Sequence, residues 1–189
     1  MPRLPTLGLP LLLTAALLAA APARAQTKYL TKKGFISFFS TSPIEDIEAR
    51  NQLVAAVVDV GSGQLAFVLP ITGFVFKRAL MQEHFNENYL ESEKYPKATF
   101  TGRFAGLTPA ALAAPGPHPA QATGDLTMHG VTRRIVAPAT LELKNGQLLA
   151  TATFDIAPAD YNIEIPLLVR DRIAKTVAVR VALACDAVK

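Results

Sequence analysis

The sequence predicts a mainly β fold, an antiparallel barrel or sandwich of about eight short strands with one helix. Three observations support this prediction. Apolar and polar residues alternate with a period of two over most of the chain, which is typical of strands with one buried face. Turn sequences rich in Gly, Asn and Asp separate several of these runs. The segment 76–89 instead has apolar residues at helical spacing.

Residues 1–25 are set aside from the fold because they are organised like a secretory signal peptide. A basic start at Arg3 precedes an apolar run from Leu7 to Ala21, and Ala23-Arg24-Ala25 has the small residues of a cleavage site. The run is shorter than the about 20 residues of a membrane span. We therefore expect residues 26–189 to be exported, to the periplasm or out of the cell, as one β domain.

Composition limits the class of partner. The formal charge of +4 falls to +2 when Arg3 and Arg24 leave with the signal peptide, which is too weak to indicate a nucleic acid. No later segment is long and apolar enough to span a bilayer, so we do not expect a transmembrane protein. The single cysteine, Cys185, lies on the apolar face of the last strand, and we expect a buried hydrophobic residue rather than a reactive thiol.

The strands follow from the alternation and from the turns. The clearest hairpin has Asn145-Gly146 at its turn, because a type I′ turn needs positive φ at both central residues. A second turn is expected at 59–63. We expect strands at 34–40, 53–58, 65–74, 98–104, 122–128, 135–143, 148–156 and 176–186.

One helix and one loop interrupt the strands. The helix is expected over 76–89, with its apolar stripe facing the barrel. Pro96 prevents the helix from continuing, since the residue before proline avoids the α region. The segment 106–121 is rich in Pro and Ala and is expected to be an exposed loop with a helical turn at 109–114. The stripe consists of Phe76, Leu80, Met81, Phe85 and Tyr89.

Catalytic and metal-binding motifs are absent from the sequence. It has no Gly-x-Ser-x-Gly, Cys-x-x-Cys or His-Glu-x-x-His. The three histidines, His84, His118 and His129, stand far apart, so their spacing does not indicate a metal site, and no cofactor is expected. His118 is expected to be solvated in the loop, His84 to anchor the helix, and His129 to be a hydrogen-bonded turn residue.

Two stretches are dense in unusual residues. The first contains His84-Phe85, Tyr95-Pro96 and Ala98-Thr99-Phe100 in that order. The second runs from Gly124 to Thr132 and reads Gly-Asp-Leu-Thr-Met-His-Gly-Val-Thr. Their order resembles that of the YceI-like family, exported proteins that bind polyisoprenoid lipids, and the resemblance covers residues 28–186. The motif positions in this chain are Tyr95, Pro96, Gly124, Asp125, His129 and Gly130.

The resemblance implies an eight-stranded antiparallel, lipocalin-like barrel with an elongated apolar cavity and one helix packed on or over it. It also reveals a departure. Many family members have an Arg-Asp pair shortly before the helical histidine, whereas this chain has Arg78-Ala79 there and Glu83 directly before His84. This puts in doubt the role of that Asp at the ligand mouth.

We expect a binding protein, not an enzyme, that holds an apolar chain such as a polyisoprenoid or an isoprenoid quinone tail in the barrel, as a carrier or buffer. Burial of apolar surface supplies about 25 cal/mol per Å² for such binding. The expected cavity residues are Phe35, Phe39, Phe67, Leu69, Phe100, Phe104, Met128, Leu141 and Phe154. The expected helix and mouth residues are Phe76, Leu80, Met81, His84 and Phe85.

Two other functions remain open at this point. One is a lipid-acting enzyme that uses His84 and His129 with Glu83 and Asp125 as acid–base groups. The other is a filled barrel that serves as a stress or interaction protein. The inward Ala and Val of the C-terminal strands fit either a cavity or a tightly packed barrel. Barrels of this kind often pair, so a homodimer is also left open.

Overall fold

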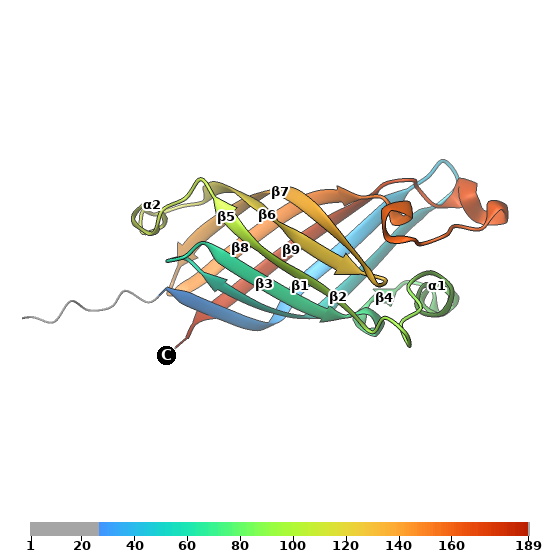
Figure 1. The fold of residues 1–189 in the computed structure, drawn as a ribbon, viewed down its shortest axis with the longest axis horizontal. Coiled ribbons are helices and arrows are strands. Elements are labelled where there is room, and N and C mark those ends of the chain that lie inside the picture. Colours follow the sequence, from blue (N-terminus) through green and yellow to red (C-terminus); the bar gives the residue numbers. More distant parts are fainter. Residues whose placement is uncertain (1–26, 189) are drawn as a thin grey trace, which may run out of the picture.

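The computed structural model describes residues 27–188, which form a closed antiparallel barrel of eight strands with one short extra strand (Figure 1). The ring order is β1-β9-β8-β7-β6-β5-β3-β2, and β2 pairs with β1 to close it. The predicted fold class is confirmed, while the predicted signal peptide lies outside the described residues. The strands are β1 (Lys28–Thr41), β2 (Asp46–Asp59), β3 (Gln64–Pro70), β4 (Val75–Phe76), β5 (Lys97–Ala105), β6 (His118–Met128), β7 (Val131–Lys144), β8 (Gln147–Ile156) and β9 (Val177–Ala187).

The hairpin between β7 and β8 has the turn that the sequence predicts. Asn145 has φ of 52° and Gly146 has φ of 80°, so both adopt the left-handed conformation that a tight hairpin needs. The predicted loop 106–121 is partly wrong, because β6 already begins at His118 and pairs with β7 from there. His118 is therefore the first residue of β6 and not part of a loop, and its ring Nε2 lies 2.9 Å from the Ala114 carbonyl oxygen. The predicted helical turn is α2 (Pro109–Leu112).

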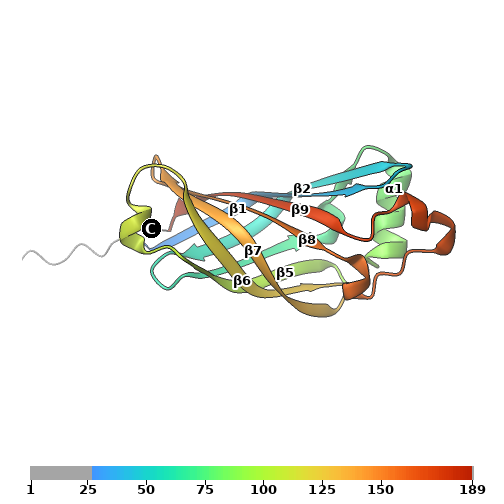
Figure 2. The same ribbon diagram turned by 90° about the horizontal axis from the view of Figure 1, so that it is seen from above.

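The predicted helix is present but shorter. It begins as α1 (Ala79–His84) and continues as a π-helical turn, η2 (Phe85–Tyr89). Its expected first residue, Phe76, belongs to β4 and pairs with Ala49 of β2. A helix of this length is not stable alone, so it depends on packing against the barrel. Figures 1 and 2 show α1 lying across one end of the barrel.

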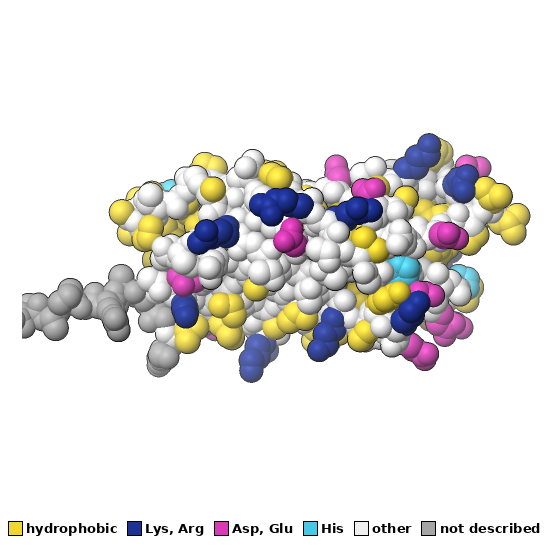
Figure 3. All heavy atoms as spheres, in the orientation of Figure 1, with side chains coloured by type: hydrophobic (Ala, Val, Ile, Leu, Met, Phe, Trp, Pro, Cys, Tyr) yellow, Lys and Arg dark blue, Asp and Glu magenta, His cyan; other side chains and the backbone are white. Residues whose placement is uncertain are grey.

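The connection between β8 and β9 also lies at the α1 end of the barrel (Figure 2). It contains two 3₁₀ helices, η3 (Pro158–Tyr161) and η4 (Leu167–Arg172), which the sequence pattern does not predict. A third, η1 (Ile71–Gly73), ends the run predicted as a strand over 65–74. On the outer face in Figure 3, basic and acidic side chains are interspersed.

The face assigned to β1 is wrong by one residue. Ile36 and Phe38 line the interior, whereas Phe39 is 42% exposed and Phe35 is half-buried on the opposite face. The local sequence Phe-Ile-Ser-Phe-Phe-Ser has large apolar residues on both faces, so alternation alone does not choose between them.

Packing at Gly34 determines the phase of β1. A Cβ atom at Gly34 would lie 2.6 Å from Leu183 Cδ2 and 3.2 Å from Val54 Cβ, and both of these side chains belong to the core. Gly34 therefore faces inward at a place with little room for a side chain, and the buried Ile36 shares its face. A register shift between Thr31 and Gly34 precedes this point, so the phase cannot be extrapolated from the start of the strand.

Cys185 is fully buried on β9, as predicted. Burial raises the pKa of its thiol from 9.0 to about 11. At about pH 8 we expect no reaction with a thiol reagent until denaturant is added, because the thiolate is the reactive form. Between pH 9 and about 11 the unfolded chain loses the thiol proton while the folded chain keeps it, so this group lowers stability as pH rises. Rapid labelling of the native protein by the thiol reagent would contradict the burial of this thiol.

Candidate lipid-binding cavity

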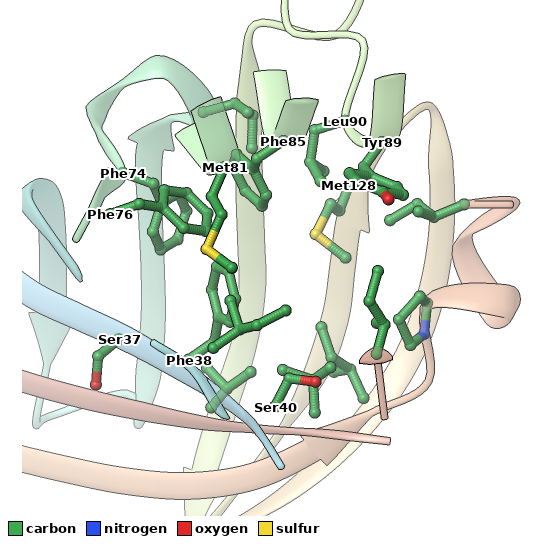
Figure 4. A pocket seen from close by; sticks show the side chains of 18 of the residues that line it. Ser37, Phe38, Ser40, Phe74, Phe76, Met81, Phe85, Tyr89, Leu90 and Met128 are labelled. Atoms are coloured by element: carbon green, nitrogen blue, oxygen red, sulfur yellow. The ribbon is translucent and has the colours of Figure 1, made fainter. Parts of the chain in front are cut away.

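The α1 end of the barrel contains a cavity of about 400 Å³, here called the outer cavity (Figure 4). This volume lies within the range of about 300–1,000 Å³ that is typical of ligand pockets. Its walls come from the inward faces of the strands, from α1 and η2, and from the β8–β9 connection. The side chains of Met81 and Met128 point into it from two sides (Figure 4).

Four phenylalanines join the helix to the barrel beside this cavity. Phe85 of η2 stacks on Phe38 with ring centroids 5.5 Å apart, and it meets Phe74 edge-on at 5.4 Å. Phe76 completes the group, 5.0 Å from Phe85. Offset and edge-to-face contacts of this kind each add about 0.5–1.5 kcal/mol beyond area burial. This aromatic cluster holds the short helix in place.

Polar groups gather at the mouth of the outer cavity. Arg78, just before α1, forms an ion pair with Glu45 of the β1–β2 hairpin. His84 and Arg172 also border the cavity, and both are exposed. The expectation that His84 anchors the helix is therefore wrong. Leu80 borders the cavity too, although 60% of it is exposed.

The β8–β9 connection forms one wall of the outer cavity. Val169 and Ile173 line it, and the Ala174 N–H donates a hydrogen bond of 2.9 Å to the buried Ser40 Oγ. Leu168, in the 3₁₀ helix η4 of this connection, is 96% exposed. Sequence reasoning missed this wall. The signal was the high apolar content of 163–173, which is unusual for a solvated connection.

The motif histidine, His129, joins the β6–β7 turn to two other segments through hydrogen-bond contacts. It sits in the β6–β7 turn with φ of 50°, and only 10% of its side chain is exposed. Its Nδ1 is 2.9 Å from the Tyr161 carbonyl oxygen, and its Nε2 is 3.1 Å from Glu91 Oε2. The Tyr95 ring contacts the imidazole edge-on at 4.7 Å. The prediction of a hydrogen-bonded turn residue is confirmed.

The glycines of the motif are positions of close packing. A Cβ atom at Gly124 would lie 2.4 Å from the Thr101 carbonyl oxygen, and one at Gly130 would lie 2.6 Å from Tyr95 Cε1. The backbone of the neighbouring strand at Gly124, and the Tyr95 ring at Gly130, come too close to leave room for a side chain. Asp125, between them, is exposed, with its carboxylate 3.7 Å from the Arg134 guanidinium. Asp125 therefore does not face the cavity.

A second, inner cavity of about 60 Å³ lies deeper in the barrel. Phe100 and Phe104 of β5 line it together with a set of small side chains. Both alternatives for the small inward residues therefore hold, each in a different half of the barrel. Phe67 and Phe154 line both cavities. The small side chains are Ala122, Ala137, Ala139, Ala150 and Ala152.

The structure places seven of the nine expected cavity residues inside the barrel; their binding role stays a prediction. Leu69 and Met128 line the outer cavity, Phe67 and Phe154 line both, and Phe35 and Phe39 line neither. The other three, Phe100, Phe104 and Leu141, line the inner cavity. Of the helix and mouth set, Phe76, Leu80, Met81, His84 and Phe85 all border the outer cavity.

The four candidate acid–base residues do not form a cluster. Both ring nitrogens of His129 are engaged as above, Asp125 lies on the outside, and Glu83 and His84 are exposed. Within residues 27–188, no group of three or more His, Cys, Asp or Glu side chains is placed to hold a metal ion. No helix in that range is long and apolar enough to cross a membrane.

Comparison with known proteins gives a consistent result. The fold matches a polyisoprenoid binding domain from Saccharophagus degradans with a TM-score of 0.73 at 20% identity, covering 86% of this chain and 99% of that one. It also matches Burkholderia cenocepacia BcnA (TM-score 0.68, 18% identity, 80% and 96% covered) and a Campylobacter jejuni YCEI protein (0.62, 15%, 79% and 90%). No curated protein matches the chain. The model of the YceI-like domain matches residues 30–185, so the chain belongs to the YceI-like family.

Proposed function

We propose that this chain is an exported binding protein that holds an apolar chain, such as a polyisoprenoid or an isoprenoid quinone tail, in the outer cavity as a carrier or buffer. The observation that supports this most strongly is the 400 Å³ cavity with walls of Phe, Leu, Ile, Val and Met. Water gains few hydrogen bonds in such a space, and smaller apolar cavities stay dry and bind hydrocarbons. The S. degradans relative, a polyisoprenoid binding domain, supports the ligand class.

The distribution of polar groups supports one orientation of the ligand. The charged side chains of Arg78, Glu45 and Arg172 lie around the mouth, whereas the residues deeper in the cavity are apolar except for the buried Ser37 and Ser40. A polar head group would remain at the mouth, where it keeps contact with water and with these charges. The apolar tail would lie along the barrel interior, where each buried methylene contributes about 0.8 kcal/mol.

Native mass spectrometry tests this proposal directly. The full chain, with residues 1–25 intact, is expressed in a host with membranes, and the exported fraction is purified without detergent. We expect a chain that begins at Gln26 and carries a lipid that organic solvent extracts and mass spectrometry identifies. Only unliganded mass after several preparations, or full-length chain retained in the cytoplasm, would contradict the proposal.

A cavity-filling variant provides the matched control. Ala98 of β5 is buried and lines the outer cavity, while Thr101 of the same strand is exposed on the outer face. Ala98→Phe adds a six-carbon ring, which fills about 150 Å³ of the cavity, and should strongly reduce the amount of lipid retained. Thr101→Phe adds the same ring outside and should retain the lipid. Equal lipid content in the two variants would place the lipid elsewhere.

A further inference from the structure

We infer that Phe67 and Phe154 form a floor that limits the bound apolar chain to about 16 carbons, close to three isoprene units. This inference rests on the proposed function and adds a length limit to it. The floor is the layer where the outer and inner cavities meet, and these two residues line both. They come from β3 and β8, which lie on opposite sides of the eight-stranded ring, so together they span the barrel.

The volumes set the capacity. An apolar cavity of about 150 Å³ holds one benzene, so about 25 Å³ serves each carbon. The outer cavity of about 400 Å³ then accommodates about 16 carbons. The inner cavity of about 60 Å³ is too small even for a benzene ring. Carbons beyond this number stay outside the mouth, where contact with water gives them no gain in affinity.

The packing below the floor keeps it closed. Phe67 is buried and stacks on Phe100, with centroids 5.2 Å apart and planes 13° from parallel. The Phe100 ring in turn covers Gly102 and Gly124, since its Cζ would lie 2.7 and 2.6 Å from Cβ atoms placed at those two residues. The stacked Phe100 ring therefore supports Phe67 from the side of the inner cavity and restricts its movement in that direction. Phe154, on the opposite wall, is half-buried and is the better residue to alter.

A chain-length series tests the floor. Prenyl alcohols of ten, fifteen, twenty and twenty-five carbons compete with a fluorescent fatty-chain probe for the purified, delipidated mature chain. Affinity should rise by about fourfold for each carbon buried between ten and fifteen. From fifteen to twenty-five carbons it should rise by no more than about fourfold in total, because about one further carbon is buried and the rest remain in water.

Removing the floor should move this limit. Phe154→Ala deletes six carbons and joins the two cavities, which makes room for about eight further carbons. The twenty-carbon alcohol should then bind at least about tenfold more tightly than the fifteen-carbon alcohol. Phe154→Leu should move the length limit in the same direction by a smaller amount. This variant replaces Phe154→Ala in the test if the alanine variant does not fold.

Phe104→Ala is the matched control, because Phe104 lines only the inner cavity and its loss leaves the floor in place. This variant should keep the limit of the unmodified chain. Affinity that keeps climbing to twenty-five carbons in the unmodified chain would overturn the inference, as would an equal shift of the limit in Phe104→Ala and Phe154→Ala. Failure of the folded chain to bind any of the alcohols would instead overturn the proposed function.

Discussion

Replacing Phe85 by Ala should lower the free energy of unfolding by about 1.5–2.5 kcal/mol, half of what full burial of a phenylalanine implies. Phe85 is half-buried, but it contacts Phe38, Phe74 and Phe76 and borders the outer cavity. Its loss should loosen α1 and η2 and weaken retention of an apolar ligand by more than global destabilisation explains. Urea melts and binding of a fluorescent fatty-chain probe on the same variant measure both effects.

Glu87 on the same π-helical turn provides the control, since its side chain is exposed. Glu87→Ala should change stability by no more than about 0.5 kcal/mol. Equal melts for the two variants would show that the aromatic cluster does not hold the helix. If the Phe85→Ala variant is destabilised but binds the probe normally, the helix stabilises the barrel and is not part of the binding site.

His129→Ala should lower the free energy of unfolding by about 2–4 kcal/mol. The variant loses the contacts to the Tyr161 carbonyl and the Glu91 carboxylate, together with the edge contact to Tyr95. Because η3 leads into the wall of the outer cavity, the fatty-chain probe should also dissociate faster. Urea melts and stopped-flow release of the probe provide the two measurements.

His129→Asn separates the hydrogen bonds from the backbone strain. Asn tolerates the positive φ at this position, but its shorter side chain cannot reach both partners. It should recover only the part of the loss that comes from strain. An Asn variant as stable as the unmodified chain would mean that the contacts to Tyr161 and Glu91 contribute nothing measurable.

The most distinctive stretch of the sequence builds the end of the barrel; most of it does not contact the ligand space. Gly124 and Gly130 allow close backbone and ring packing, His129 joins three segments, and Asp125 lies outside. Of this stretch, Leu126 and Met128 line the outer cavity. Substitutions at the motif should therefore change stability first and ligand binding second.

Arg78, which the resemblance would place in an Arg-Asp pair, has an acidic partner at the mouth of the outer cavity. Arg78 forms its ion pair with Glu45 from the β1–β2 hairpin rather than with a neighbour on the helix. This pairing links α1 to the hairpin across the cavity mouth. It depends on two residues that are distant in the sequence, so no local pattern could have predicted it.

The sequence by itself determined the approximate positions of the eight barrel strands, the tight hairpin at Asn145-Gly146 and the burial of Cys185, because each depends on local periodicity or local backbone preference. Only the tertiary structure decided which face of β1 points inward, since Gly34 must fit against Leu183 and Val54 from other strands. The division of the barrel interior into two cavities likewise depends on tertiary packing. A cavity is the volume left between side chains from opposite walls, such as Phe67 and Phe154, and no local pattern along one strand specifies it.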